Sequence, residues 1–152
     1  MRLTLHTDFA LRLLMLLALE PDELHTIAEV ARRYNISRNH LVKVAQTLIQ
    51  GGFVESVRGR CGGLKLAKRP ADINLGAVVR ATEDGFALVE CFDRKRNCCV
   101  VMPACGLRRP LEQALDAFLT ALDGCTLADA MQNPGRTTRM RRLLEDGVGL
   151  RA

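Results

Sequence analysis

Four of the six cysteines of this 152-residue chain lie in one stretch, CFDRKRNCCVVMPAC, residues 91–105. They are Cys91, the adjacent pair Cys98 and Cys99, and Cys105. Grouped thiols bind zinc, hold iron–sulfur clusters or exchange disulfides. Structural zinc sites commonly use Cys-x2-4-Cys pairs and thioredoxin-like sites use Cys-x-x-Cys, and neither spacing is present here. The irregular spacing favours an iron–sulfur cluster, with a zinc site and inert or redox thiols as open alternatives.

Three basic residues, Arg94, Lys95 and Arg96, lie between Cys91 and the cysteine pair. Positive charge beside a thiol favours the thiolate, which is the form that binds metal, and it offsets the negative charge of a bound cluster. The whole sequence has three histidines and no Ser/His/Asp or paired-carboxylate arrangement. These patterns do not predict a catalytic centre, and the chain is not expected to be an enzyme.

The net charge of +5 is concentrated in the first half of the chain. Residues 1–70 carry 11 Lys and Arg against 6 Asp and Glu, whereas residues 71–152 carry 11 of each kind. An excess of positive charge in one region favours an anionic partner such as DNA. No run reaches the roughly 18 apolar residues of a membrane span, and the first residues lack the features of a signal peptide. We therefore expect a cytoplasmic protein whose thiols stay reduced.

The sequence around these charges predicts a winged helix-turn-helix. Thr26 and Glu29 have the spacing of a capping box, Ser37 is a further helix cap, and Asn35 tolerates the left-handed backbone of a tight turn. The predicted elements are a helix capped by Thr7 or Asp8 and running to about Leu19, helices over 27–34 and 38–50, and strands over 53–58 and 63–67. The expected fold is mostly α with a small β wing: a winged helix-turn-helix DNA-binding domain followed by a long dimerisation helix.

The start of the second helix and the tip of the wing carry side chains suited to DNA. Arg and Lys donate to guanine in the major groove, Asn binds adenine through its amide, and recognition helices reach base edges with their N-terminal ends. An Arg on a Gly-flanked hairpin tip fits a narrow minor groove. The residues predicted to contact double-stranded DNA are Arg38, Asn39, His40 and Lys43 on the helix and Arg58 and Arg60 on the wing. The alternative interpretation is a solvated polar surface.

After the wing, the sequence predicts a helix over 75–82 capped by Asn74, the cysteine loop over 85–105 and a long helix over 107–122. An apolar stripe on this long helix is expected to pair with its copy in a two-fold dimer. The stripe consists of Leu111, Leu115, Phe118, Leu119 and Leu122. The final residues are rich in Arg and are expected to be loose. The predicted division is a DNA-binding domain over 1–70, the cysteine loop and dimerisation helix over 71–131, and a flexible tail over 132–152.

In five segments the chain resembles the NsrR-type nitric oxide-sensing repressors, within the wider family of dimeric iron–sulfur winged-helix regulators that includes IscR. The segments are MRLTLHTDFALR, SRNHLVKV, VRGRCGGLKLA, the loop ending CVVMPAC, and FLTALDGCTLADAM, and the resemblance spans about residues 1–131. It implies that Cys91, Cys99 and Cys105 match the three cysteine ligands of the family. Seven residues separate Cys91 from Cys99, more than is usual in the family, so Cys98 is the alternative ligand.

NsrR-type members also have an aspartate at the position of Asp8, which the other subunit supplies to complete a [4Fe–4S] cluster. IscR-like members have a histidine at the position of Arg108. The resemblance therefore implies that Asp8 is the fourth ligand, with Arg12 one turn later placed to pair with it. From the residues alone, an acid at a helix N-terminus with an i,i+4 salt bridge also explains both side chains.

Together these features predict a homodimeric repressor that binds a palindromic operator while its cluster is intact. Nitric oxide is the expected signal, and operator release is expected when the cluster is nitrosylated. Three alternatives stay open: a regulator of the same family that senses iron supply or general oxidation, a zinc-stabilised interaction module, and a thiol redox enzyme.

Overall fold

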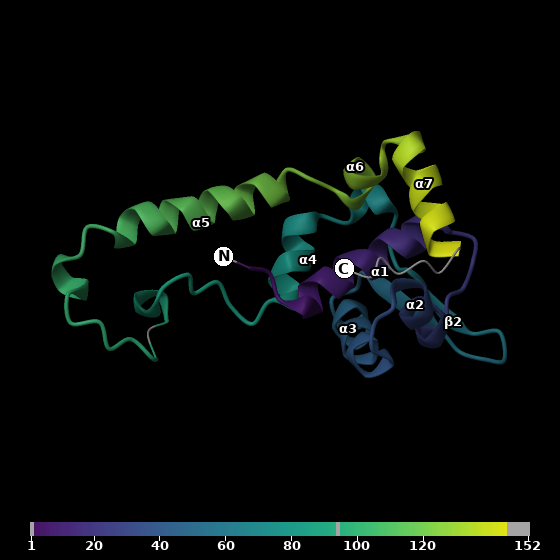
Figure 1. The fold of residues 1–152 in the computed structure, drawn as a ribbon, viewed down its shortest axis with the longest axis horizontal. Helices are drawn as coiled ribbons and strands as arrows, with labels where there is room; N and C mark the ends of the chain where they lie inside the picture. The colour runs from purple at the N-terminus through teal and green to yellow at the C-terminus, as the bar shows by residue number, and fades with distance from the viewer. Residues whose placement is uncertain (1, 94, 146–152) are drawn as a thin grey trace.

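The computed structural model describes residues 2–93 and 95–145, so Arg94 lies outside the described residues. Figure 1 shows a group of helices with a small wing, from which one long helix and the cysteine loop extend as an arm. The predicted fold class, mostly α with a two-stranded sheet, is confirmed. The elements are α1 (Leu5–Leu19), α2 (Ile27–Tyr34), α3 (Arg38–Gln50), β1 (Val54–Val57), β2 (Gly63–Leu66), α4 (Leu75–Thr82), α5 (Arg108–Asp123), α6 (Leu127–Met131) and α7 (Pro134–Glu145), with short 3₁₀ helices η1 (Pro70–Asp72), η2 (Glu90–Phe92) and η3 (Met102–Ala104).

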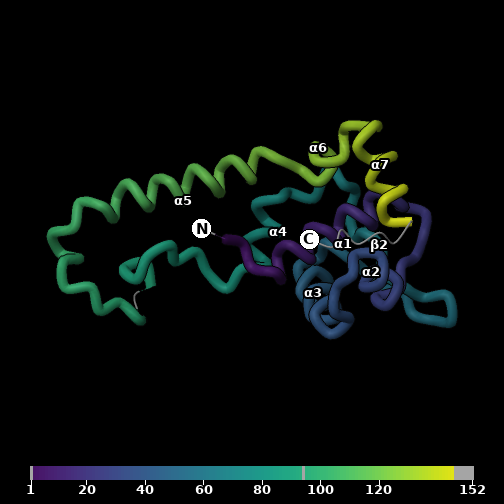
Figure 2. The backbone as a smooth tube through the Cα atoms, viewed as in Figure 1, coloured from purple at the N-terminus to yellow at the C-terminus, as the bar shows by residue number. Residues whose placement is uncertain are grey.

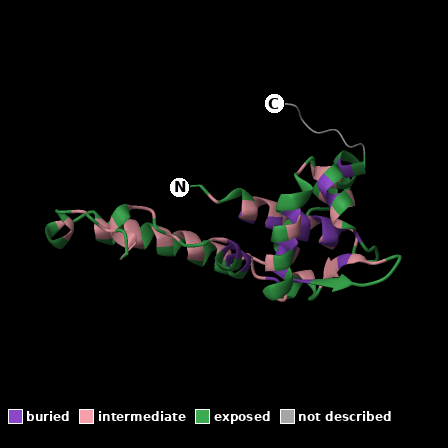
Figure 3. Cartoon of the chain, turned by 90° about the horizontal axis from the view of Figure 1, so that it is seen from below, coloured by how far each residue is buried: buried purple, intermediate pink, exposed green. Residues whose placement is uncertain are grey.

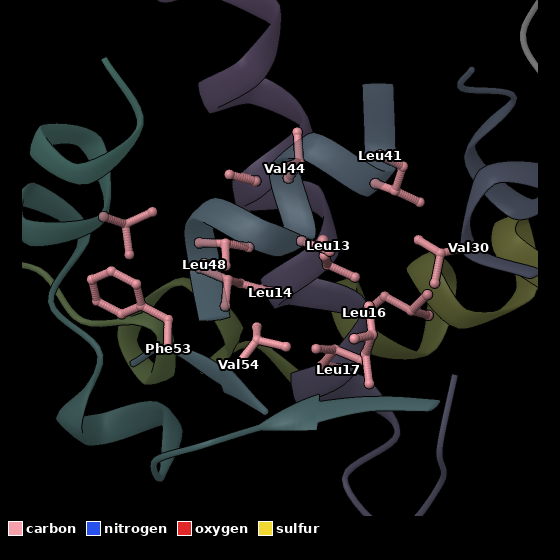
Figure 4. Packing of buried hydrophobic residues seen from close by; sticks show 14 of the residues in the cluster. Leu13, Leu14, Leu16, Leu17, Val30, Leu41, Val44, Leu48, Phe53 and Val54 are labelled. Atoms are coloured by element: carbon pink, nitrogen blue, oxygen red, sulfur yellow. The ribbon is translucent and has the colours of Figure 1, made fainter. Parts of the chain in front are cut away.

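The core is built around α1, which is apolar on nearly all of its faces. A helix with this pattern is stable when neighbours cover it on all sides, and Leu13, Leu14 and Leu16 are fully buried. α3, α4, α6 and β2 pack against α1, and Figure 4 shows the side chains of α1 and α3 in one shared apolar cluster. Removing one such leucine side chain costs about 2–5 kcal/mol of stability. α1 therefore holds α3, the wing and the base of the arm in one unit.

α1 starts earlier than the sequence predicts, and neither Thr7 nor Asp8 is its cap. Thr4 is the cap, and its hydroxyl accepts a hydrogen bond from Thr7 N at 3.3 Å. Thr7 is instead buried, with its hydroxyl 2.9 Å from the hydroxyl of Thr82 on α4. The amide and hydroxyl of Thr4 also donate to Glu83 Oε1, at 2.8 and 3.0 Å. The residue at which the helix begins is thus held by a contact between distant parts of the chain.

α2 and α3 form the predicted helix-turn-helix, with the predicted bounds. Thr26 caps α2 by accepting from Glu29 N at 3.2 Å, but the Glu29 carboxylate faces other side chains and does not complete the capping box. Asn35 has the expected left-handed backbone, with φ 53°. Ser37 precedes α3 as predicted, although its side chain makes no capping hydrogen bond. Packing on α1, rather than a cap, therefore fixes the start of α3.

β1 and β2 form an antiparallel wing with four residue pairs in register. Gly59 in the connecting turn has φ 127°, which residues with a Cβ avoid. Gly62 allows the chain to pass close to the carbonyl of Val57, where a Cβ would overlap the oxygen. The wing is tied to the core through His25 and Leu64, whose amides donate to each other's carbonyls at 3.2 and 2.8 Å. The wing is therefore attached at a defined place beside the end of α1.

The cysteine loop leads away from the core and α5 runs back towards it, and together they form the arm seen in Figures 1 and 2. Its base is fastened to α4, because Arg80 donates to both oxygens of Asp123 at 2.5 and 2.7 Å and Asn74 Nδ2 donates to Asp123 O at 2.6 Å. The hydrogen bond from Arg80 lowers the pKa of Asp123. Asn74 Oδ1 accepts from Ala77 N at 2.9 Å, which confirms it as the cap of α4. Every residue of α5 is described and none is buried; in Figure 3 the outer part of the arm has only the intermediate and exposed colours.

α7 occupies most of the segment that was expected to be loose, so that prediction is wrong for residues 134–145. Leu144 joins the hydrophobic core, and Arg141 Nη2 donates to Leu19 O at 2.6 Å. This cation satisfies a carbonyl at the C-terminal end of α1, where the helix dipole is negative. Residues 146–152 of the predicted tail lie outside the described residues. Among the helices that are described, none is long and apolar enough to cross a membrane.

Candidate functional site

α3 has one buried side and one exposed side near its N-terminus. Leu41, Val44 and Leu48 are buried, and their packing fixes the orientation of the helix on α1. The exposed side chains at its start are Arg38, Asn39, His40 and Lys43. The structure therefore brings these four predicted DNA contacts together on one surface, at the end of the helix that enters a major groove in proteins of this architecture.

The wing tip adds two further cations, Arg58 and Arg60, which are both exposed. Within residues 2–93 and 95–145, no carboxylate lies within ion-pair distance of these two guanidinium groups or of Arg38 and Lys43. Exposed cations without a carboxylate partner are suited to neutralise phosphates. The predicted DNA-binding surface, defined here as the start of α3 and the tip of the wing, thus carries four such side chains in each chain.

The first turns of α1 contact α3 directly. The ring centroids of Phe9 and His40 lie 6.3 Å apart, with the rings tilted by 46°. His6 Nε2 lies 3.0 Å from Thr47 Oγ1, and a small cavity of about 220 Å³ separates the two helices nearby. Asp8 lies between His6 and Phe9 in the sequence. A movement of this turn of α1 would therefore displace side chains that touch α3.

Asp8 and Arg12 form the predicted i,i+4 pair. Arg12 Nη2 lies 2.7 Å from Asp8 Oδ2, and Arg12 Nε donates to Asp8 Oδ1 at 3.1 Å, so both carboxylate oxygens are bound. The two side chains are 40% and 41% exposed, so water screens the pair and the carboxylate stays accessible. Tyr34 Oη donates to Arg12 O at 2.9 Å, and burial raises the pKa of Tyr34 to about 12. In the described chain, no hydrogen bond or ion pair joins Asp8 to the cysteine loop.

The predicted cysteine ligands all lie on short turns of the arm. Cys91 is in η2, whereas Cys99 and Cys105 lie on either side of η3. Met102 N donates to Cys99 O at 3.3 Å, and Cys105 N donates to Met102 O at 3.3 Å, so consecutive turns connect these two cysteines. The three thiols are partly exposed, Cys98 is fully on the surface, and all four are free. The loop thus presents unpaired thiols without burying them.

The sulfur atoms of the loop are not assembled around a single-ion position. In the part of the chain that the structure describes, the only group of three metal-binding side chains with ligand atoms within 4.8 Å of one another is Glu20, Glu23 and His25. A single zinc ion is therefore not favoured by the loop in this conformation. An iron–sulfur cluster is larger, and its ligands bind different iron atoms. Three free thiols on one loop are the type of ligand that such a cluster uses.

Arg108, at the start of α5, lies close to the loop. Its Nε donates to Glu112 Oε1 at 2.8 Å, and this hydrogen bond is the main cause that raises the pKa of Arg108. Cys91 is near enough to add to the same effect. A guanidinium cannot bind a metal, so Arg108 is not a candidate metal ligand.

Sequence patterns missed Glu83, which joins the root of the cysteine loop to the start of α1. Its carboxylate accepts from Thr4 although the two residues are 79 positions apart, and no local signal marks such a contact. They also missed His25, which is fully buried beside Glu20 and Glu29. The three-dimensional structure is needed to place Glu83 beside Thr4 and His25 beside Glu20 and Glu29.

The family profile named Rrf2 and described as "Iron-dependent Transcriptional regulator" matches residues 3–133. The chain belongs to the Rrf2 family. The HTH-type transcriptional regulator NsrR of Bacillus subtilis (strain 168) is 49% identical over 146 residues, which cover 95% of this chain and 100% of that protein. The HTH-type transcriptional regulator NsrR of Geobacillus kaustophilus (strain HTA426) is 46% identical over 150 residues, covering 98% and 100%. The predicted resemblance to NsrR-type regulators is therefore confirmed.

Solved structures of related proteins have the same fold. The structure of CymR (YrzC), the global cysteine regulator of B. subtilis, has 25% sequence identity and a TM-score of 0.69, covering 86% of this chain and 95% of that one. T. potens IscR has 23% identity and a TM-score of 0.66, covering 87% of each chain, which shows the shared fold alone. The relatives are transcriptional regulators, a non-enzymatic class. The protein is thus a DNA-binding transcriptional regulator of the Rrf2 family, as its sequence predicts.

Proposed function

We propose that this protein is a cytoplasmic, homodimeric repressor that senses nitric oxide through a [4Fe–4S] cluster. Cys91, Cys99 and Cys105 of one subunit and Asp8 of the other hold the cluster, and residues 1–70 of each subunit bind half of a palindromic operator. The observation that carries the proposal is 49% identity to an NsrR in a chain whose loop presents three free thiols. The bound cluster would supply iron that reacts with nitric oxide.

The apolar stripe of α5 supports the homodimer. Leu111 and Phe118 line a groove of about 450 Å³ together with residues 85–89, and no residue of α5 is buried in the single chain. Near the end of the arm, Val100 is 91% exposed and Leu107 is 71% exposed. Covering such apolar surface with a second copy contributes roughly 25 cal/mol per Å². A two-fold axis along the arm would bury the same stripe in both subunits.

Asp8 is suited to be the ligand that is lost first. A carboxylate is a harder ligand than a thiolate, so iron in a sulfur-rich site holds it less firmly. Arg12 orients both oxygens, and the partial exposure of the pair lets another subunit reach them. Because His6 and Phe9 on either side of Asp8 contact α3, releasing Asp8 would move the recognition helices of the dimer. The movement would misalign the two recognition helices with the half-sites of the operator. A coupling free energy of about 1–3 kcal/mol between cluster and operator binding is typical of such switches.

The two adjacent cysteines provide a matched test of the ligand set. Cys99→Ser and Cys98→Ser remove neighbouring thiols, one assigned to the cluster and one not. After anaerobic purification, we expect iron and sulfide in the Cys98→Ser protein at the level of the parent chain and their loss from the Cys99→Ser protein. The reverse result would make Cys98 the ligand. Full iron content in both variants would show that the pair does not hold the cluster.

A regulator that responds to iron supply is the second candidate, and the description of the family as an iron-dependent transcriptional regulator favours it. Such a regulator releases its operator when iron is withdrawn, without nitric oxide. Operator affinity is therefore compared for the cluster-loaded protein, the same protein after nitric oxide, and the protein after anaerobic removal of iron by a chelator. Release by nitric oxide supports the first candidate. Release by the chelator alone supports the second.

A further inference from the structure

A group of ionisable side chains lies under the wing, away from the arm. His25 is fully buried, and neither of its ring nitrogens has a hydrogen-bond partner within the described residues. Its Nε2 lies 3.2 Å from Glu20 Oε2 and its Nδ1 lies 3.5 Å from Glu29 Oε1. Both distances are short, but neither contact is aligned as a hydrogen bond. Unsatisfied buried polar atoms cost stability, so a buried imidazole without hydrogen bonds calls for a partner that the described residues do not supply.

Glu23 adds a third ligand beside Glu20 and His25. One ligand atom from each of these residues lies within 4.8 Å of the other two. The turn between α1 and α2 fixes the spacing, since Glu23 N donates to Glu20 O at 3.2 Å. Glu23 is exposed, Glu20 is partly buried and His25 is buried. These three residues are named here the His25 site. Their side chains extend from the surface at Glu23 to the buried ring of His25.

The charges around the His25 site are unbalanced. Arg33 is the cation that contacts the carboxylates: it donates to Glu20 at 2.7 and 2.9 Å and lies 3.1 Å from Glu29. Glu23 adds a third negative charge, so with a neutral imidazole the three carboxylates outnumber the one guanidinium that pairs with them by two, and Arg141 is a further cation nearby, bound to Leu19 O. Glu20 also lies at the C-terminal end of α1, where the helix dipole disfavours an anion. A divalent cation would neutralise the excess.

We propose that Glu20, Glu23 and His25 bind a divalent metal ion of the kind that prefers oxygen and imidazole ligands, such as Mn²⁺. One imidazole and two carboxylates are hard to borderline ligands, in contrast to the thiols of the cysteine loop. The ion would be coordinated by Nε2 of His25, the ring nitrogen that faces Glu20. This site is separate from the proposed cluster and does not depend on it.

The His25 site has a structural consequence for the wing. The backbone of His25 pairs with Leu64 of β2 through two hydrogen bonds, and Gly63 lies so close to His25 that a Cβ would come within 3.0 Å of its backbone. Metal binding at Glu20 and Glu23 would thus fasten the end of α1 to the base of the wing. Since the wing carries Arg58 and Arg60, the ion would support the DNA-binding surface from behind.

The proposal is tested with Mn²⁺ alone, titrated into the full-length protein by calorimetry, with electron paramagnetic resonance to follow the bound ion. Mn²⁺ avoids the thiols that zinc would occupy. Glu23→Gln removes one ligand at an exposed position without disturbing the core, and Asp22→Asn, at the neighbouring exposed acid, is the matched control. We expect one ion per chain, an affinity lower by on the order of tenfold or more in Glu23→Gln, and no change in Asp22→Asn.

A second readout separates the site from non-specific binding. The bound ion should raise the melting temperature of the parent protein and of Asp22→Asn, and should raise it less in Glu23→Gln, because ligands that bind only the folded state stabilise it. Equal affinity in the parent and Glu23→Gln would overturn the proposal, as would loss of binding in the Cys99→Ser protein. A His25 imidazole that carries two protons at neutral pH and ignores Mn²⁺ in nuclear magnetic resonance spectra would also overturn it.

Discussion

Replacing Arg60 on the wing tip by alanine should change how salt affects operator binding. The DNA-binding surface has four cations without a carboxylate partner in each chain: Arg38, Lys43, Arg58 and Arg60. A dimer would present eight, and each phosphate contact contributes about −0.9 to the slope of log Kobs against log salt concentration, so the expected slope is about −7. Arg60→Ala removes two of the eight contacts and should reduce the magnitude of the slope by about 1.8.

This difference is large enough for fluorescence anisotropy with a labelled operator under anaerobic conditions. Between about 50 and 200 mM salt, affinity should fall about 2 × 10⁴-fold for the parent protein and about 2 × 10³-fold for the Arg60→Ala protein. At the lowest salt concentration the variant should bind more weakly than the parent. The two curves should therefore converge as salt rises, which distinguishes lost phosphate contacts from a folding defect.

Arg139→Ala is the matched control, because it removes the same charge from an exposed position of α7. Figure 1 shows α7 well separated from α3, so the salt slope of this variant should equal that of the parent. An unchanged slope in Arg60→Ala, or an equal change in both variants, would refute the assignment of the wing tip to DNA. Equal changes would indicate instead that the net charge of the protein governs binding.

Three further predictions concern the dimer, the last helix and the buried tyrosine. Phe118→Asp should shift sedimentation from dimer to monomer, whereas Gln113→Asp, at an exposed position outside the stripe, should leave a dimer. Leu144→Ala should lower the free energy of unfolding in urea by about 2–3 kcal/mol, and Leu143→Ala, half-exposed beside it, should lower it by less than about 0.5 kcal/mol. Because burial raises the pKa of Tyr34 from 10.0 to about 12, the unfolded chain loses this proton first, and stability should fall between these two pH values. Tyr34→Phe should remove that part of the decline when unfolding is measured at pH values across the interval.

Local signals predicted the elements that carry their own caps and turns. The bounds of α2, α3 and α4 follow from Thr26, Asn35 and Asn74, together with a clear helical spacing of apolar residues. The start of α1 could not be predicted in this way, since Thr4, its cap, is also held by Glu83, 79 residues further along the chain. Local sequence contains no record of such a contact.

α7 escaped prediction because its composition is dominated by arginine. A few apolar side chains, among them Leu144, anchor the helix against α2 and α6, and Arg141 donates to Leu19 O at the end of α1. In the candidate site, too, local contacts could be predicted and the conformation of the long loop could not. The pairing of Asp8 with Arg12 follows from i,i+4 spacing and is confirmed, whereas the choice between Cys98 and Cys99 depends on a loop without a regular period and stays a prediction.

Operator binding by the anaerobically prepared dimer, measured before and after addition of nitric oxide, tests the proposed function most directly. Iron and sulfide are determined on the same sample, so that cluster content and affinity are compared for one preparation. We predict a protein that contains iron and sulfide, binds its operator tightly, and loses that affinity after nitric oxide. A metal-free protein that binds the operator equally well with and without nitric oxide would contradict the proposal.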